Sequence, residues 1–210
     1  FFDMLIVPHH DRVRGDNVIV TKAALNRINQ SRIAASTDNV PQQWQTAASP
    51  RVAVMIGGDN RRYKISHDMA THMAQQLAAF AAANKANLFL VASQRCPDTV
   101  LKYLQTALPQ NHCMIATNEQ PNPYPGILTM ADAVIVTSDS VNMVSEAAST
   151  GKPVLIAYWR AEVGRIAKFH QTMHDGKHTA PLTELLPAGP FVPLDESATI
   201  RQQISARLAH

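Results

Sequence analysis

Short, continuous apolar runs recur along the chain, and each is followed by a segment long enough for a helix. Residues 52–56, 88–92 and 133–136 are examples. A strand with one face in solvent alternates apolar and polar residues, so continuous runs indicate strands that are buried on both faces. The sequence therefore predicts an α/β fold with a doubly wound, Rossmann-like parallel sheet. Function is expected in the loops beyond the carboxyl ends of its strands.

The other expected elements continue this alternation. Further strands are expected at residues 4–7, 18–21, 114–116 and 154–157, with a weaker one at 191–194. Helices are expected at residues 22–33, 67–83, 98–108, 141–150, 162–173 and 197–208.

A polar segment with two prolines, residues 36–50, predicts a linker. Residues 1–35 hold only two strands and one helix, too little for an independent core, so we expect them to be the tail of a truncated N-terminal α/β domain. Residues 51–194 hold a complete α/β set. Residues 195–210 form a C-terminal helix for which packing on either part is open.

Charge and cysteine content narrow the class of protein. The chain has 19 Lys and Arg against 16 Asp and Glu, a formal charge of +3, and its densest basic cluster is Arg61, Arg62 and Lys64. This pattern disfavours nucleic-acid binding through a broad positive face. Two cysteines do not make a disulfide framework, and no apolar run approaches the roughly 18 residues of a membrane span. We expect a cytoplasmic protein.

Three good helix-capping residues, Ser138, Asp139 and Ser140, follow the apolar run at 133–136. The helix that they begin leaves its first backbone N–H groups unpaired, and these groups, with the positive end of the helix dipole, favour an anion. A diphosphate fits this position. Asn142 and Glu146 share one face of the helix, and Glu146 needs a hydrogen-bonding partner, for which a ribose diol is suitable. The alternative is a solvated outer face.

A second turn, Gly57-Gly58, follows the run at 52–56 and precedes Asp59, Arg61, Arg62 and Lys64. It lacks the spacing of the dinucleotide fingerprint and of the P-loop, so both of those sites are excluded. Arg95, after the next strand, reaches the same edge of the sheet, where it pairs with phosphate or caps a helix. A purely structural turn is the alternative for the two glycines.

Residues 51–194 resemble the donor-binding half of GT-B glycosyltransferases, a fold shared by the bacterial peptidoglycan N-acetylglucosaminyltransferase and the UDP-N-acetylglucosamine 2-epimerases. The residues that carry this resemblance are Gly57-Gly58, Ala131 to Ile135, Ser138 to Ser140, Met143-Val144-Ser145-Glu146-Ala147 and Gly151-Lys152-Pro153-Val154. In those relatives the helix N-terminus holds the diphosphate of a nucleotide sugar, and the glutamate at the Glu146 position binds ribose.

Nearly the whole chain is similar to a family of bacterial proteins that resemble the plant mitochondrial-fission factor whose loss gives elongated mitochondria. These proteins are often labelled nucleoside-diphosphate-sugar epimerase-like. The matching segments are Pro8-His9-His10-Asp11, Gly15-Asp16-Asn17-Val18, Ile56-Gly57-Gly58-Asp59, Ser93-Gln94-Arg95, Asn122-Pro123-Tyr124 and the residues from Val136 to Glu146. Members of this family are longer at the N-terminus.

The resemblance implies a glycosyltransferase that binds a nucleoside-diphosphate sugar and an acceptor, without a metal or other cofactor. His10 and Asp11 are the implied acid–base residues of the N-terminal half. The two prolines beside Tyr124 separately indicate a loop where a base packs, or else a rigid turn that binds no ligand. A loop salt bridge between Asp11 and Arg12 or Arg14 is the alternative. Two other functions stay open: a non-catalytic scaffold with a partner or peripheral membrane contact, and a sugar-nucleotide 2-epimerase.

The spacing of His170, His174 and His178 is compatible with a metal on one helical face. Asp175-Gly176 should end the helix before the third histidine, so we expect no metal site there.

Overall fold

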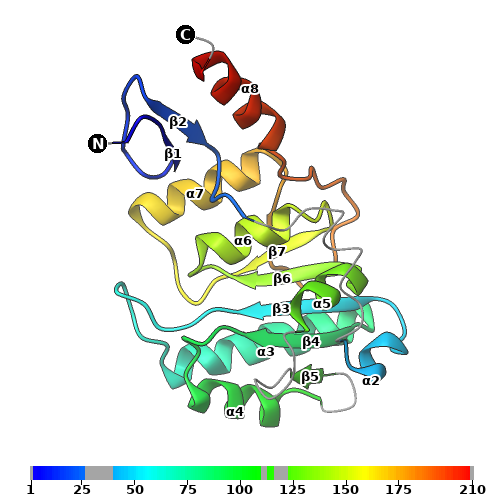
Figure 1. The fold of residues 1–210 in the computed structure, drawn as a ribbon. Coiled ribbons are helices and arrows are strands. Elements are labelled where there is room, and N and C mark those ends of the chain that lie inside the picture. The colour runs from blue at the N-terminus through cyan, green and yellow to red at the C-terminus, as the bar shows by residue number, and fades with distance from the viewer. Residues whose placement is uncertain (1, 27–39, 110–112, 116–122, 209–210) are drawn as a thin grey trace.

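The continuous apolar runs form one parallel sheet in the computed structural model, which describes residues 2–26, 40–109, 113–115 and 123–208 (Figure 1). Within these residues the sheet has six strands in the order β5-β4-β3-β6-β7-β8. The strands are β3 (Arg51–Ile56), β4 (Asn87–Ala92), β5 (Cys113–Ile115), β6 (Ala133–Thr137), β7 (Val154–Ala157) and β8 (Ala180–Pro181). Every neighbouring pair is parallel.

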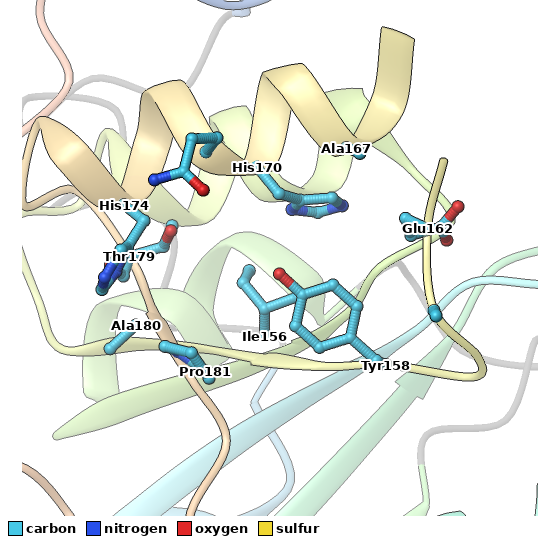
Figure 2. A pocket seen from close by; sticks show the side chains of 11 residues that line it. Ile156, Tyr158, Glu162, Ala167, His170, His174, Thr179, Ala180 and Pro181 are labelled. Atoms are coloured by element: carbon cyan, nitrogen blue, oxygen red, sulfur yellow. The ribbon is translucent and has the colours of Figure 1, made fainter. Parts of the chain in front are cut away.

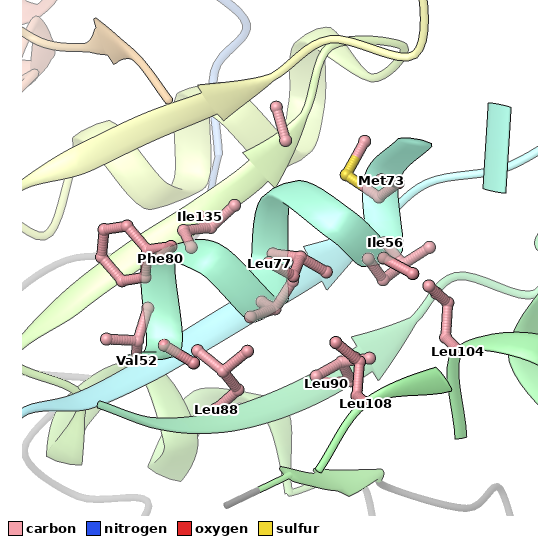
Figure 3. Close-up of a cluster of buried hydrophobic side chains, with 14 of the residues drawn as sticks. Val52, Ile56, Met73, Leu77, Phe80, Leu88, Leu90, Leu104, Leu108 and Ile135 are labelled. Atoms are coloured by element: carbon pink, nitrogen blue, oxygen red, sulfur yellow. The ribbon is translucent and has the colours of Figure 1, made fainter. Parts of the chain in front are cut away.

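Helices cover both faces of this sheet. Alternate residues of β3 separate two apolar clusters: Val54 packs with α3 (His67–Asn84) and α4 (Asp98–Ala107), whereas Met55 packs with the helices of the opposite face. Figure 3 shows the first cluster, where Leu77 and Phe80 of α3 lie over the strands. The opposite face is covered by α5 (Tyr124–Met130), α6 (Val141–Ala148) and α7 (Gly164–Asp175). The predicted doubly wound α/β fold is confirmed.

The strand order reverses between β3 and β6, which are neighbours in the sheet although they are distant in sequence. After β3, the strands β4 and β5 are added on one side of the sheet. After β6, the strands β7 and β8 are added on the opposite side. The helices that follow these two central strands therefore lie on opposite faces and leave a crevice beyond the strand ends. Gly57 follows β3 there, and Ser138 follows β6.

The N-terminal segment makes a separate pair of strands, β1 (Leu5–Pro8) and β2 (Val18–Thr21), which are parallel. The C-terminal helix α8 (Ser197–Leu208) packs on this pair (Figure 1). The Arg207 guanidinium donates to the Val18 carbonyl at 3.2 Å, and the Glu196 carboxylate accepts from the Lys22 N–H at 2.7 Å. These contacts decide the open question of where the last helix packs.

Three expected elements need correction. Residues 191–194 are not a strand, because the Val192 and Leu194 N–H groups bond to carbonyls outside the sheet, and β8 forms the edge instead. Residues 22–26 are not helical, and the rest of that expected helix lies outside the described residues. Helix α7 begins at Gly164, where φ is +66°, so Glu162 belongs to the preceding loop.

Two helices were not predicted. The first is α5, because prolines on both sides of Tyr124 resembled a loop, although Pro125 is tolerated in a first helical turn. The second is α2 (Gln42–Gln45), within the expected linker, where Trp44 is fully buried against Phe89 with ring centroids 4.8 Å apart. Residues 27–39 of the expected tail and linker lie outside the described residues. No helix in the described ranges is long and apolar enough to cross a membrane.

Lys152 closes the C-terminal end of α5, and its replacement tests that contact. The ammonium donates to the carbonyls of Leu128, Thr129 and Ala131 at 2.5–2.6 Å. We expect Lys152→Met, which keeps the apolar stem, to lower the free energy of unfolding by about 1–3 kcal/mol, because buried carbonyls lose charged donors. Urea denaturation measures this change. Lys168→Met, on the exposed side of α7, should stay within about 0.5 kcal/mol of wild type, and an equal loss in both variants would contradict the role of Lys152.

Candidate functional site

Asp139 joins the loops that follow β3 and β6. Its side chain is fully buried. One carboxylate oxygen accepts from the Gly58 N–H at 2.9 Å, and the other accepts from the Thr137 hydroxyl at 2.7 Å and the Trp159 indole N–H at 3.1 Å. Thr137 in turn accepts from the Gly57 N–H at 2.7 Å. The carboxylate is thus directed inward and fixes both loops at the edge of the crevice.

The Gly57-Gly58 turn is explained by close approach. A Cβ atom at Gly57 would overlap the Asp139 carboxylate, and one at Gly58 would overlap the Arg95 carbonyl. Arg95 is half exposed and places its guanidinium 3.9 Å from Asp139. The glycines therefore let the β3 loop pack against its neighbours, as the structural alternative predicted. This packing leaves their predicted contact with a nucleotide untested.

Helix α6 begins at the same edge. The Ser140 hydroxyl accepts from the Met143 N–H at 3.5 Å, so Ser140 is the N-cap among the three residues proposed. Ser138 is buried and donates to Glu162 at 2.9 Å. The first turn of α6 presents its unpaired N–H groups beyond the strand ends.

A pocket of about 330 Å³, which we call the switch-point pocket, lies beside this first turn. It joins the N-terminal loop with the loops after β3, β6 and β7 and the start of α7. Its lining residues are His10, Asp11, Arg62, Asp139, Val141, Val163, Arg165 and Ile166. His10 and Asp11 are 128 or more positions from Asp139 in sequence, yet the fold brings them into one cavity.

His10 and Asp11 have different surroundings in the switch-point pocket. The His10 ring lies edge-on to Phe169, with centroids 5.3 Å apart, and its Nδ1 is buried without a partner in the described part of the chain. Burial lowers the pKa of His10 below its ordinary value, although Asp11 acts in the opposite direction. Asp11 pairs with Arg165 of α7 at 3.3 Å, and Arg14 donates to backbone carbonyls instead. Asp11 does form a salt bridge, as the alternative interpretation proposed, but its partner is Arg165 of α7 and not Arg14 of its own loop.

Arg62 is the cation of the β3 loop that enters the switch-point pocket. It donates to Glu162 at 2.8 Å and to the Asp139 carbonyl at 3.1 Å. The neighbouring Arg61 is exposed and is not among the pocket residues. Asp59 accepts from the Ile65 N–H at 3.0 Å and from Lys64 at 3.1 Å, so it stabilises its own loop.

Glu162 and Arg165 are the site residues that the sequence reasoning missed. Glu162 has a side chain that is only 4% exposed, and it accepts from Arg62 and Ser138. Its position in the loop after β7 could have identified it, because polar residues beyond the carboxyl ends of parallel strands are candidates for ligand contacts. Arg165 has no such signal, because its approach to Asp11 depends on how α7 packs against the N-terminal loop.

Glu146 of α6 and Tyr124 of α5 are in direct contact. The Tyr124 hydroxyl donates to the Glu146 carboxylate at 2.6 Å. Burial and the adjacent carboxylate raise the pKa of Tyr124, so its hydroxyl stays protonated as the donor. Ser145 is buried and accepts from the Ala24 N–H at 3.3 Å, whereas Asn142 is exposed. The solvated-face alternative for Glu146 is thus replaced by a specific partner.

The three spaced histidines take separate roles. Helix α7 ends at Asp175, as the Asp175-Gly176 pair predicted. His170 bonds the Ser138 carbonyl at 2.9 Å and His178 bonds the Val192 carbonyl at 2.7 Å. Within the part of the chain that the structure describes, no group of three or more His, Cys, Asp or Glu side chains is arranged to hold a metal ion.

Comparison with known proteins agrees with the family resemblance. The family described as Mitochondrial fission ELM1 matches residues 1–208. Mitochondrial fission protein ELM1 of Arabidopsis thaliana is 26% identical over 237 aligned positions, which cover 98% of this chain and 55% of that protein. A protein of Rickettsia prowazekii is 30% identical over 152 positions, which cover 71% of this chain and 42% of that protein. The chain thus spans about half the length of these curated relatives.

Among solved structures, the UDP-GlcNAc 2-epimerase from Neisseria meningitidis, bound to UDP-GlcNAc, matches with a TM-score of 0.48 and 14% identity. The match covers 94% of this chain and 48% of that one. Because the pattern of one family spans the sequence from residue 1 to residue 208, this chain belongs to the mitochondrial fission ELM1 family.

Proposed function

We propose that this protein binds a nucleoside-diphosphate sugar beside the switch-point pocket and transfers the sugar as a metal-independent, GT-B-type glycosyltransferase. The observation that carries the proposal is the composition of that pocket. Arg62, Arg165 and the first turn of α6 share it with His10 of the N-terminal segment. It lies where the strand order reverses, the usual ligand position in open α/β sheets.

The diphosphate would bind between Arg62, Arg165 and the N-terminus of α6. Guanidinium groups bind phosphate through paired N–H donors, and a helix N-terminus adds backbone donors and a favourable dipole. Arg62 and Arg165 are held by Glu162 and Asp11, so each is already oriented before ligand arrives. A volume of about 330 Å³ is at the lower end of known ligand sites, which start near 300 Å³.

The ribose would bind at Glu146. Its carboxylate has one oxygen engaged by Tyr124, which fixes its orientation and leaves acceptor capacity for a diol. A carboxylate that accepts from both ribose hydroxyls discriminates a nucleotide from a simple phosphate.

In the proposed reaction the acceptor hydroxyl attacks the anomeric carbon of the sugar. The bond from that carbon to the diphosphate oxygen breaks, and the nucleoside diphosphate leaves with the electron pair. His10 would take the acceptor's proton, since a pKa below the ordinary value keeps the imidazole neutral near pH 7. Arg62, Arg165 and the α6 N-terminus would stabilise the charge on the leaving diphosphate. The proposal involves no cofactor.

A non-catalytic scaffold is the second candidate, and one observation favours it. The acidic and basic groups of the site are already paired with one another: Glu162 with Arg62 and Asp11 with Arg165. A ligand must compete with these contacts, whereas a scaffold would keep them for rigidity. The Arabidopsis relative carries the name of a mitochondrial fission protein, not of a transferase.

Calorimetric titration with UDP, GDP, ADP and CDP tests the proposal. We expect the chain to bind one of them selectively and Glu146→Ala to weaken that affinity about 10- to 100-fold, because charge-assisted hydrogen bonds to ribose are lost. Glu184→Ala removes the same charge from an exposed position after β8 and should bind as wild type does. Binding of none of the four nucleotides would overturn the enzyme proposal in favour of the scaffold.

A further inference from the structure

A second pocket lies against α7, away from the switch-point pocket. It has a volume of about 230 Å³ and is formed by α7, the loop after β7 and the edge strand β8. In its lining the His170 and Tyr158 rings meet edge-on, with centroids 5.4 Å apart, and Figure 2 shows Glu162 at one end and His174 and Thr179 at the other. We call it the α7 pocket. Arg165 and Ile166 line the switch-point pocket, whereas Ala167 and His170 line this one, so the helix separates the two.

Two histidines give the α7 pocket hydrogen-bond acceptors. His170 Nε2 lies 2.9 Å from the Ser138 carbonyl, and His174 Nδ1 lies 3.2 Å from the Thr179 carbonyl. A carbonyl only accepts, so each of these nitrogens carries a proton, and in the neutral imidazole the lone-pair acceptors are His170 Nδ1 and His174 Nε2. His170 is 95% buried, and its Nδ1 has no partner among the residues that the structure describes. An unpaired buried acceptor is costly and calls for a donor.

The charged and apolar residues of the α7 pocket restrict the class of ligand that it can bind. The residues that line the α7 pocket, all of them described, include no lysine or arginine to hold an anion. Both Glu162 oxygens already accept, from Arg62 and Ser138, so a cation would gain little there. Ile156, Ala167 and Pro181 supply apolar contacts beside the Tyr158 ring. Burial keeps the Tyr158 hydroxyl protonated by raising its pKa.

The size of the cavity sets the size of the ligand. At roughly 30 Å³ for each water in the liquid, 230 Å³ corresponds to about seven or eight waters. We propose that the α7 pocket is a second binding site, for a neutral polyol of the size of one sugar ring, whose hydroxyl groups donate to His170 Nδ1 and His174 Nε2. This site does not depend on nucleotide binding at the switch-point pocket.

The experiment is a titration of the isotope-labelled full chain with free glucose, N-acetylglucosamine, mannose and myo-inositol, followed by amide chemical shifts. A ligand of about 12 non-hydrogen atoms should bind with a dissociation constant of roughly a few millimolar. We expect saturable shifts at the amides of Ala167 and Thr179. Ala167→Leu extends a half-buried side chain into the cavity and should abolish them, whereas Lys168→Leu, on the adjacent exposed position, should not.

The outcomes separate this site from the proposed transferase site. Saturable shifts around the α7 pocket that Ala167→Leu removes, with nucleotide binding unchanged in that variant, would support the proposal. Absence of saturation for all four compounds, or shifts confined to His10 and Val141 in the switch-point pocket, would overturn it. Shift mapping on the wild-type chain decides the matter even if Ala167→Leu folds poorly.

Discussion

Replacing Asp139 by alanine is expected to lower the free energy of unfolding by about 3–5 kcal/mol. The substitution removes a buried carboxylate and leaves the N–H groups of Gly58 and Trp159 and the hydroxyl of Thr137 without their acceptor. An unsatisfied buried donor costs about 1–3 kcal/mol, and breaking a buried charged network costs several. Urea denaturation followed by circular dichroism measures the loss. The fluorescence of Trp159, whose indole N–H is bonded to Asp139, should change in the folded state.

Two further variants control this prediction. Asp175→Ala removes an exposed carboxylate that accepts from Gln171 within one helix, so the free energy of unfolding should change by less than about 0.5 kcal/mol. Asp139→Asn keeps the shape of the side chain, but its amide NH2 group would face one of the donors that now bond to Asp139. This variant should therefore also destabilise the fold. If Asp139→Ala were as stable as Asp175→Ala, Asp139 would not be the connection between the two loops.

Arg62→Ala is expected to weaken nucleoside-diphosphate binding about 10- to 100-fold, whereas Arg61→Ala is expected to leave it unchanged. The two arginines are adjacent in sequence and equal in charge, but only Arg62 is among the residues of the switch-point pocket. A lost contact between guanidinium and phosphate is worth about 1.5–3 kcal/mol, which corresponds to that range of affinity. Calorimetric titration with the nucleotide that binds wild type gives both dissociation constants.

Arg62→Ala also leaves Glu162 without its cation, so a stability measurement must accompany the titration. Arg165→Ala supplies a variant without that complication. Its side chain is 65% exposed, and its salt bridge with Asp11 contributes little to folding. We expect it to lose affinity while its melting temperature stays near that of wild type. Equal affinity in Arg61→Ala, Arg62→Ala and Arg165→Ala would mean that the diphosphate does not bind in the switch-point pocket.

The central strands and their helices were predictable because burial on both faces leaves a local signature. Residues 52–56 and 133–136 are apolar without interruption, and they became β3 and β6 with nearly the expected limits. The elements that were missed or misplaced lack this signature. Helix α5 begins between prolines, and β8 comprises only Ala180 and Pro181, so its identity as a strand depends on its partner β7.

The candidate site was predictable in part for the same reason. The turns after β3 and β6 were identified because they follow buried strands, but the strand order that makes them neighbours came only from the structure. The orientation of each side chain was not predictable. Asp139 could face a ligand or the interior, and the choice depends on Gly58, Thr137 and Trp159, which come from three different loops or strands.

The sequence by itself determined the α/β class, the alternation of strands and helices, and the two polar turns that follow β3 and β6. These features follow from apolar periodicity and capping residues, which act over a few neighbouring positions. Only the tertiary structure decided that α8 packs on β2, that Asp11 pairs with Arg165, and that Tyr124 holds Glu146. Each of these contacts joins residues that are far apart in the chain, so it exists only after the helices have packed on both faces of the sheet.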